Sequence, residues 1–309
     1  MKKFYLVIIV ILALLSVLLL LQNNNIKSPE IIDIISSEFS NEQKVNIIGY
    51  DGDAMEPYIS RDEKYLFFNN HKGKNDKDIY YAEKIDALNF QFKGEVQGVN
   101  TPYVDGNPTM DSNMNFYFIT TRDIKPGDFN TIYMGIFEDG YVKQLKKIEG
   151  SINVDKKRWA NMGVEITKDG DFMYTSNAHF KAGTNSLSEG DIRFAIREGE
   201  KFNIPKNEKE ILKNINTDYA VEYAGEVSDD GTELFYSQVT LSNPPQFKLY
   251  HAKRNNTAEP FGTSKFITEP FKKDKNAFVE APTLSSDGNR LYYHKLDGGK
   301  FLIFMLSRN

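Results

Sequence analysis

The sequence predicts an all-β protein, a five-bladed β-propeller of four-stranded antiparallel blades. A short strand-like run that ends in a polar turn and leads into an aromatic-rich run occurs five times. The copies recur at roughly 50 to 60 residues, the length of a four-stranded blade with long loops. With 40% hydrophobic and 13% aromatic residues, the chain can build a sizeable core. We therefore expect one closed ring of blades rather than two domains.

Each repeat can be divided into strands by its apolar runs and turn residues. The first strands run into the turns at Glu56–Ser60, Asn107–Asp111, Glu165–Gly170, Glu226–Gly231 and Ala281–Gly288. The second strands are Tyr65–Phe68, Phe116–Ile119, Phe172–Tyr174, Leu234–Tyr236 and Leu291–Tyr293. The third strands are Asp78–Tyr81, Thr131–Met134, Asp191–Phe194, Lys248–Tyr250 and Leu302–Met305. Fourth strands are expected at Phe92–Val96, Val142–Leu145, Glu210–Leu212 and Lys265–Ile267.

The fifth repeat reaches the end of the chain at Asn309 before a fourth strand. The run Lys44–Ile48, upstream of the first repeat, resembles the other fourth strands. Its pairing with the last blade would close the ring and remove both open sheet edges. The propeller is therefore expected to span residues 44–309.

Residues 1–25 are predicted to be a signal anchor or a signal peptide. Lys2 and Lys3 precede an apolar run from Phe4 to Leu21, about 18 residues, which is longer than the apolar run of most cleavable signals. This favours a retained transmembrane helix that places the propeller outside the cytoplasm, in the periplasm or the extracellular space. Cleavage, which would release a periplasmic or secreted propeller, is the alternative.

Residues 26–43 are expected to form a connector. Ser28 and Pro29 suit the start of a helix, and isoleucines from Ile31 onward fall with Phe39 on one helical face. The chain has no cysteine, which excludes a disulfide framework and a lipid-modified cysteine anchor.

The turn Ser285–Gly288 before an aromatic strand, together with Asp78–Tyr81, resembles the WD-like repeats of the TolB-like propellers. The resemblance covers about residues 50 to 307, and the second repeat departs most because Asp111–Asn115 replaces the Asp-Gly turn. It implies a propeller that binds or scaffolds a protein, peptide or glycan, since such repeats serve protein binding and peptidase gating.

Long loops of a propeller gather on one face, opposite the tight turns, and rigid scaffolds usually carry binding sites on such loops. The expected binding face holds Glu56, His71, Arg122, Trp159, His179, Glu222, Tyr223 and His294. Trp159, Tyr223 and other loop aromatics could form a platform for sugar or peptide, and packing between blades explains them equally well.

An alternative function is glycoside hydrolysis, since some five-bladed propellers are glycoside hydrolases. Asp53, Asp105 and Glu280 could then be catalytic carboxylates. A structural role, satisfying backbone groups of the next blade, is the favoured interpretation, so we lean toward a protein that is not an enzyme.

Other ligands are not expected. The histidines lack ligand spacing for a metal, and no phosphate loop or dinucleotide fingerprint indicates a cofactor. A net charge of −5 carries no nucleic-acid signature.

Overall fold

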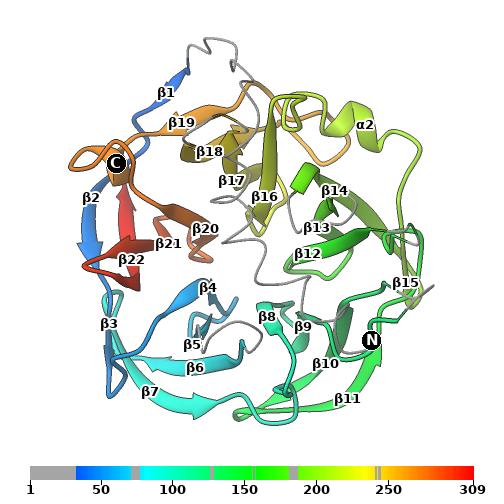
Figure 1. Ribbon diagram of the computed structural model, residues 1–309, viewed down its shortest axis with the longest axis horizontal. Coiled ribbons are helices and arrows are strands. Elements are labelled where there is room, and N and C mark those ends of the chain that lie inside the picture. Colours follow the sequence, from blue (N-terminus) through cyan, green and yellow to red (C-terminus); the bar gives the residue numbers. More distant parts are fainter. Residues whose placement is uncertain are drawn as a thin grey trace.

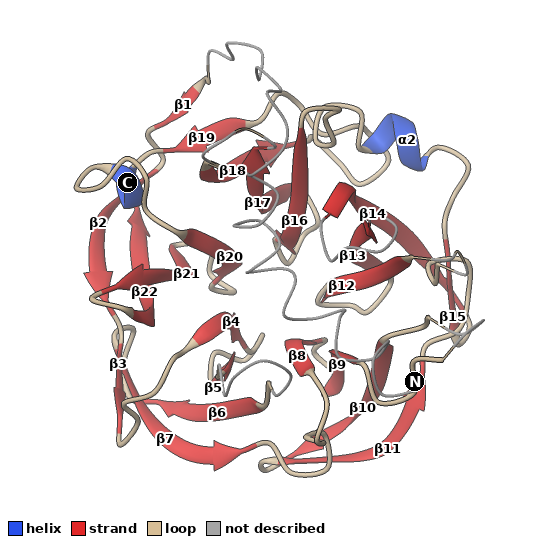
Figure 2. Ribbon diagram, viewed as in Figure 1, coloured by secondary structure: helices blue, strands red, loops and turns tan. Residues whose placement is uncertain are grey.

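The computed structural model describes residues 33–70, 77–125, 129–154, 156, 158–180, 187–240, 242 and 245–309. Five antiparallel sheets stand around a common axis (Figure 1), and almost all regular structure is strand (Figure 2). The predicted five-bladed β-propeller is confirmed. Residues 1–32, which include the predicted anchor, lie outside the described residues. Among the described residues, no helix is long and apolar enough to cross a membrane.

The four strands of each blade run from the axis outward. Blade one holds β4 (Met55–Ile59), β5 (Tyr65–Asn69), β6 (Ile79–Lys84) and β7 (Asn89–Glu95). Blade two holds β8 (Asp105–Met110), β9 (Asn115–Thr120), β10 (Ile132–Glu138) and β11 (Tyr141–Lys147). Blade three holds β12 (Trp159–Ile166), β13 (Phe172–Phe180), β14 (Leu187–Glu198) and β15 (Lys201–Asn203). Blade four holds β16 (Ala220–Val227), β17 (Glu233–Thr240), β18 (Phe247–Lys253) and β19 (Lys265–Ile267).

Blade five combines both ends of the described chain. It holds β20 (Val279–Leu284), β21 (Arg290–Asp297), β22 (Lys300–Arg308) and, antiparallel to β22, the N-terminal strand β2 (Phe39–Lys44). The sequence analysis placed Lys44–Ile48 as the fourth strand of blade five. That prediction was wrong except at the first residues of the run. Most of it forms β3 (Asn46–Ile48), which pairs in parallel with β7 of blade one. The chain thus passes from blade five to blade one within a few residues.

Two further predictions are corrected. The described part of the connector, from residue 33 onward, is not helical. It contains β1 (Ile35–Ser36), which pairs in parallel with β19, and β2 follows directly. The run Glu210–Leu212 is not a strand: α2 (Glu208–Ile211) occupies it, and β15 is the fourth strand of blade three. A short apolar run fits either structure, and here Ile211 and Leu212 are buried between blades three and four. A 3-10 turn, η2 (Glu269–Phe271), precedes blade five.

The recurrent turn has a local cause. In blade five, Ser285 Oγ donates to Asp287 at 2.5 Å, Asp287 accepts the Asn289 N–H at 3.0 Å, and Gly288 adopts a φ of +72°. Glycine enters this left-handed conformation at little cost, which explains the Asp-Gly pair. In blade two, Asp111 accepts the N–H groups of Asn113 and Asn115 instead.

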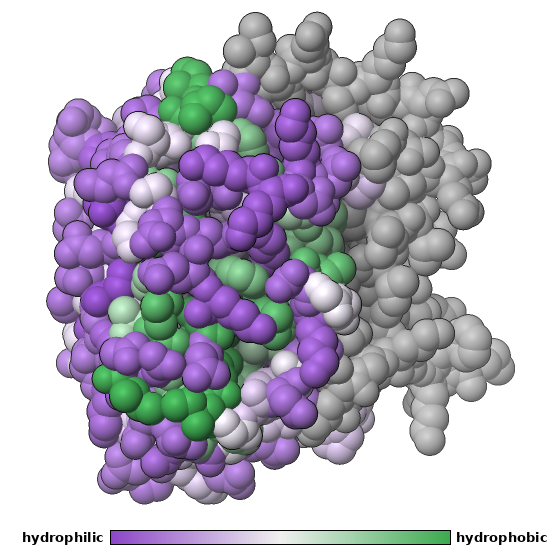
Figure 3. All heavy atoms as spheres, turned by 90° about the vertical axis from the view of Figure 1, so that its left-hand side faces the viewer, coloured by the Kyte–Doolittle hydropathy of each residue, from purple (hydrophilic) through white to green (hydrophobic). Residues whose placement is uncertain are grey.

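Aromatic and aliphatic side chains of neighbouring blades fill the space between the sheets. In one such cluster, Phe67 of blade one contacts Phe116 of blade two with ring centroids 5.2 Å apart. The outer side of the ring near β2 and β3 is mainly hydrophilic, with apolar groups gathered in the lower part of the view (Figure 3). The core therefore lies between blades and leaves the axis to more polar residues.

Candidate binding site on the propeller axis

The innermost strand of every blade carries a bulge, seen as a shift in its pairing register with the second strand. Four residues at these bulges adopt positive φ values: Glu56 at 48°, Asn107 at 49°, Ala224 at 48° and Ala281 at 52°. A bulge turns the following side chains in a new direction. These bulges therefore shape the wall of the central channel.

Each of these four residues donates its N–H to a side chain on the second strand of the preceding blade. Glu56 donates to His294 Nδ1 at 3.1 Å, and Ala224 donates to Ser176 Oγ at 2.7 Å. The corresponding bonds of Asn107 to Asn69 and of Ala281 to Ser237 measure 3.1 and 2.9 Å. The backbone N–H groups at the bulges, which would otherwise be unpaired, thus find hydrogen-bond acceptors across the blade interface.

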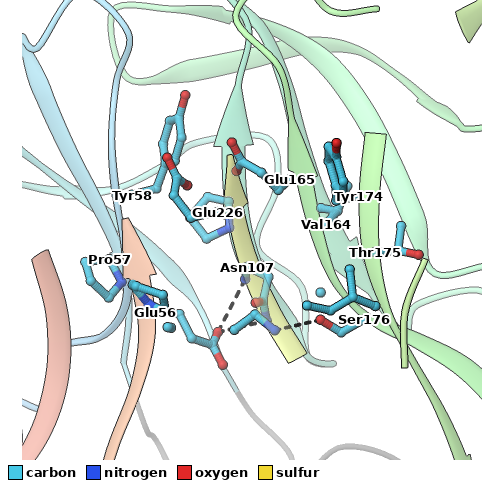
Figure 4. A pocket seen from close by; sticks show the side chains of 17 residues that line it. Glu56, Pro57, Tyr58, Asn107, Val164, Glu165, Tyr174, Thr175, Ser176 and Glu226 are labelled. Carbon is cyan, nitrogen blue, oxygen red and sulfur yellow. Dashed lines mark hydrogen bonds between the residues drawn. The ribbon is translucent and has the colours of Figure 1, made fainter. Parts of the chain in front are cut away.

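A pocket on the axis is lined by residues of all five innermost strands and of β13 and β14. Its cavity volume is about 40 Å³, room for a few water molecules. Figure 4 shows Glu56, Asn107 and Ser176 toward one end, and Glu165 and Glu226 toward the other.

Arg61 pairs with two carboxylates that line the pocket, Glu165 and Glu226. Its guanidinium bridges to Glu165, donates to the Ile166 carbonyl at 2.8 Å, and lies 3.4 Å from Glu226. It also lies 3.2 Å from Asp229, a carboxylate that pairs with Lys168 at 2.9 Å. Arg61 is only 7% exposed, so this is a buried ion-pair network that joins blades one, three and four.

Glu165 and Glu226 form a coupled pair. Burial raises the pKa of Glu165, against the opposing effect of Arg61 and Thr109. Burial and the adjacent Glu165 raise the pKa of Glu226 well above its usual range. The two carboxyl groups hydrogen-bond to each other, and Arg61 supplies one positive charge for both. We conclude that the pair holds a proton near neutral pH.

At the opposite, mouth end, four of the predicted binding-face and catalytic residues meet. Tyr223 donates its hydroxyl to Glu280, and Glu280 lies 3.4 Å from His294 Nε2. Because His294 Nδ1 accepts the Glu56 N–H, neutral His294 carries its proton on Nε2, toward Glu280. The Glu56 carboxylate pairs with Lys77 at 2.5 Å. This network links blades four, five and one.

The other two predicted catalytic carboxylates, Asp105 and Asp53, each have hydrogen-bond or ion-pair partners close in space. Asp105 is buried, pairs with Arg122 at 2.9 Å and accepts the Thr101 hydroxyl at 2.6 Å. Burial raises the pKa of Asp105. Asp53 accepts the Phe301 N–H at 2.9 Å.

Glu222 and two blade-three aromatics, Trp159 and His179, make other contacts. Glu222 accepts hydrogen bonds from Thr217 and Gln238, and burial raises its pKa to about 7. Trp159 and His179 stack with ring centroids 5.0 Å apart. His71 lies outside the described residues.

In the described part of the chain, Glu38, Glu233 and His251 are the one group of acidic and histidine side chains close enough together to hold a metal. Lys253 lies 2.6 Å from Glu38, and Arg308 lies 2.7 Å from Glu233. Burial opposes ionisation of Glu233, but His251 and Arg308 lower its pKa to about 2. These cations already occupy the carboxylate oxygens, so we interpret the group as an ion-pair network.

No family model and no curated protein matches this sequence. Solved structures do. The catalytic domain of a family 62 α-L-arabinofuranosidase from Coprinopsis cinerea has a TM-score of 0.52 and 12% identity, covering 88% of this chain and 97% of that one. Zg3597, a family 117 glycoside hydrolase from Zobellia galactanivorans, has a TM-score of 0.53 and 10% identity, covering 89% and 91%. At such identities these matches establish the propeller fold alone.

TolB propellers are also among the similar structures, as the repeat signature implies. TolB from Acinetobacter baumannii has a TM-score of 0.43 and 14% identity over 84% of this chain. The chain spans 55% of the length of that TolB structure.

The sequence analysis did not identify Arg61, Asn107 or Ser176 as site residues. Arg61, Lys168 and Asp229 each follow the first turn residue of their repeat directly. Charges of opposite sign at equivalent positions of a ring were the available signal for the ion-pair network. Ser176 had no such signal, because its role depends on the neighbouring blade.

Proposed function

We propose that the propeller is a non-catalytic binding or scaffolding module that holds a protein, peptide or glycan on its long-loop face. The observation that carries this proposal is the small volume of the axial pocket, whose carboxylates Glu165 and Glu226 are engaged by Arg61. Enzyme pockets for drug-sized or sugar-sized ligands hold about 300–1,000 Å³. A cavity of about 40 Å³ is too small to enclose a sugar ring.

The carboxylates also argue against glycoside hydrolysis. Hydrolases of this type place two carboxyl groups about 5–5.5 Å or 6.5–9.5 Å apart across the bond they cleave. Glu165 and Glu226 instead touch each other. Asp53, Asp105 and Glu280 each accept hydrogen bonds from neighbouring residues. The similarity to glycoside hydrolases is a similarity of fold, and proteins with many different functions share this fold.

The full-length chain is therefore expected to show no turnover of aryl α-L-arabinofuranosides or arabinan oligosaccharides. Asp53→Asn, Asp105→Asn and Glu280→Gln should leave the same background rate, because each of these carboxylates is already engaged by neighbouring residues. Reducing-sugar release and chromogenic assays check this. Cleavage by the wild-type chain that one of the three changes abolishes would establish a hydrolase instead.

We also propose that Phe4 to Leu21 anchors the chain in the membrane with the propeller outside the cytoplasm. A spanning helix is held by transfer of apolar side chains, so the full-length protein should stay in the membrane fraction in high salt. Protease added outside the cytoplasmic membrane should reach the propeller. Soluble protein whose first residue lies at Gln22 or beyond would contradict the anchor and indicate a cleaved signal.

A further inference from the structure

We propose that the outer edge of blade four around β1 docks on the anionic surface of the membrane that anchors the chain. This inference rests on the proposed anchor and goes beyond the proposed binding function, because it concerns how the propeller is oriented. The surface, which we name the β1 rim, consists of Ile34, Ile35, Lys265, Lys273 and Lys275. Three observations support it: the short chain that precedes it, its exposed isoleucines and its unpaired lysines.

The described chain begins at the outer edge of the ring. β1 is the outermost strand of the sheet of blade four, beyond β19 (Figure 1). Only residues 22–32 separate the predicted anchor from Asp33. A stretch of that length spans at most about 40 Å, whereas a compact domain of this size has a radius of gyration of about 19 Å and measures about 50 Å across. The far edge of the ring, at blade two, therefore cannot rest on the membrane, but the β1 rim can.

Two large apolar side chains are exposed on this edge. Ile34 is 52% exposed and Ile35 is 55% exposed, although isoleucine is among the residues most often buried. Backbone pairing fixes both: the Ile34 carbonyl accepts the Phe266 N–H at 2.7 Å, and Ile35 lies opposite Phe266 in the parallel pair. These side chains thus stand on a rigid sheet edge, where they can insert at the boundary between head groups and acyl chains.

Lysines lie beside these isoleucines. Lys265 belongs to β19, the strand that pairs with β1. The ring of Phe271 packs on Phe266 of β19 with centroids 5.2 Å apart, so the loop that carries Lys273 and Lys275 starts next to the same strand. These three lysines are exposed and make no ion pair within the described part of the chain. Their charges are therefore available to lipid head groups.

The charge balance of this edge is positive. Segments 33–38 and 265–275 hold four carboxylates and four lysines, and Asp33, Glu38 and Glu269 already pair with lysines. Ion-pair partners on neighbouring strands add three cations and one carboxylate: Lys248, Lys253, Arg308 and Glu233. Two positive charges are left in excess, although the net charge of the chain is −5. An anionic membrane surface attracts such a patch within about 10 Å.

Docking by the rim leaves both faces of the propeller clear of the membrane. Because the strands of a blade run from the axis outward, a ring that rests on its edge has its axis along the membrane plane. The mouth with Glu280 and His294 then opens sideways and stays accessible to a partner. The anchor also holds the rim at a high local concentration near the lipid, so a surface of this modest size suffices.

Quenching of a fluorescent probe by nitroxide-labelled lipid tests this orientation with the full-length chain in vesicles. The chain has no cysteine, so one introduced cysteine carries the only probe. Asn276→Cys places the probe beside the β1 rim, and Tyr141→Cys places it on the outer edge of blade two, where Tyr141 is 48% exposed. In vesicles of phosphatidylcholine with one third phosphatidylglycerol, we expect at least threefold stronger quenching at position 276 than at position 141. In phosphatidylcholine alone, that difference should fall at least twofold.

Variants of the β1 rim identify the groups responsible. Combined Lys265→Gln, Lys273→Gln and Lys275→Gln should lower quenching at position 276 to the level at position 141, because the attraction to anionic lipid is lost. Combined Ile34→Ser and Ile35→Ser should lower it at least twofold. The matched control makes the same lysine-to-glutamine change at three half-exposed positions of blades two and three and should leave quenching unchanged: Lys143, Lys146 and Lys201.

Docking of the β1 rim is overturned if vesicle-bound chains show equal quenching at the two probe positions, or if the rim variants quench like the wild type. A blue shift at position 276 that lacks lipid quenching and grows with the number of chains per vesicle would indicate a second copy of the chain on this surface, and would also overturn it. Chains that fail to float with the vesicles would overturn the anchor and this inference together. Flotation with equal quenching leaves the anchor intact.

Discussion

Deletion of residues 1–49 is expected to lower the melting temperature of the chain by about 10 °C or more beyond the effect of deleting residues 1–38. Only the longer deletion removes β2, the partner of β22 in blade five. It also removes Phe39, which is 3% exposed and packs against Phe235 of blade four with ring centroids 5.6 Å apart. Loss of one buried phenylalanine costs about 3–5 kcal/mol. The exposed β22 edge should also promote aggregation.

Thermal melts followed by circular dichroism, compared with the full-length chain, check this prediction. Deletion of residues 1–38 serves as the control, since among the described residues it removes Asp33 to Glu38, with the two-residue strand β1 and the ion pairs of Asp33 and Glu38, but leaves β2 in place. Phe39→Ala in the full-length chain separates the packing contribution from the strand pairing. Equal melting temperatures of the two truncated chains would show that β2 does not hold the ring closed.

Replacement of Arg61 by methionine is expected to destabilise the propeller by about 3–5 kcal/mol at pH 7. The change keeps much of the side-chain volume but leaves Glu165 and Glu226 buried without a counter-ion. Arg61→Lys should rescue little, because an ammonium cannot match the planar guanidinium that reaches Glu165, Glu226 and Asp229 together. Urea denaturation at constant pH gives the free energy of unfolding.

Lys168→Met is the matched control, because Lys168 contacts the same Asp229 from the surface with a half-exposed side chain. Exposed ion pairs contribute about 0–1 kcal/mol, so this variant should remain near wild-type stability. If Arg61→Met lowers the free energy of unfolding by no more than Lys168→Met does, Arg61 is not the counter-ion of the buried Glu165–Glu226 pair.

The pH dependence provides an independent measure of the same network. In the unfolded chain both glutamates titrate near 4.5, whereas in the folded chain burial raises the pKa of Glu165 to about 7 and raises the pKa of Glu226 well above its usual range. The folded chain thus holds more protons in this window, and this pair makes stability fall as pH rises from about 4.5 to about 7. Tyr58, Arg61, Asp229 and Lys168 are the other titratable or charged groups of the network.

Glu226→Gln should remove most of this loss of stability between pH 4.5 and pH 7. It leaves one carboxylate for Arg61, so the variant should match the wild type near pH 5. At pH 8 it should be more stable by at least about 1.4 kcal/mol, the free energy of one pKa unit. A parallel pH dependence of the two chains would contradict a proton held by this pair.

Much of the fold could be predicted because its signals are local. The Ser-x-Asp-Gly turn is specified by Ser285, Asp287 and Gly288 themselves, and the following aromatic strands alternate toward the two neighbouring blades. Within the candidate site, the sequence indicated Glu56, Tyr223, Glu280 and His294 as residues of one face, and these do form one network. It did not indicate which of them would contact which, because each comes from a different strand.

The sequence by itself determined the repeat length, the number of blades, the tight turns and the strands built around them, because these follow from side-chain period and turn chemistry within a few residues. Tertiary structure alone decided that Phe39–Lys44 closes blade five, that Glu208–Ile211 is helical, and that Arg61 reaches Glu165 and Glu226. Those outcomes depend on contacts between residues more than a hundred positions apart or on packing between blades. No local pattern encodes them, since the partners meet only once the ring has closed around its axis.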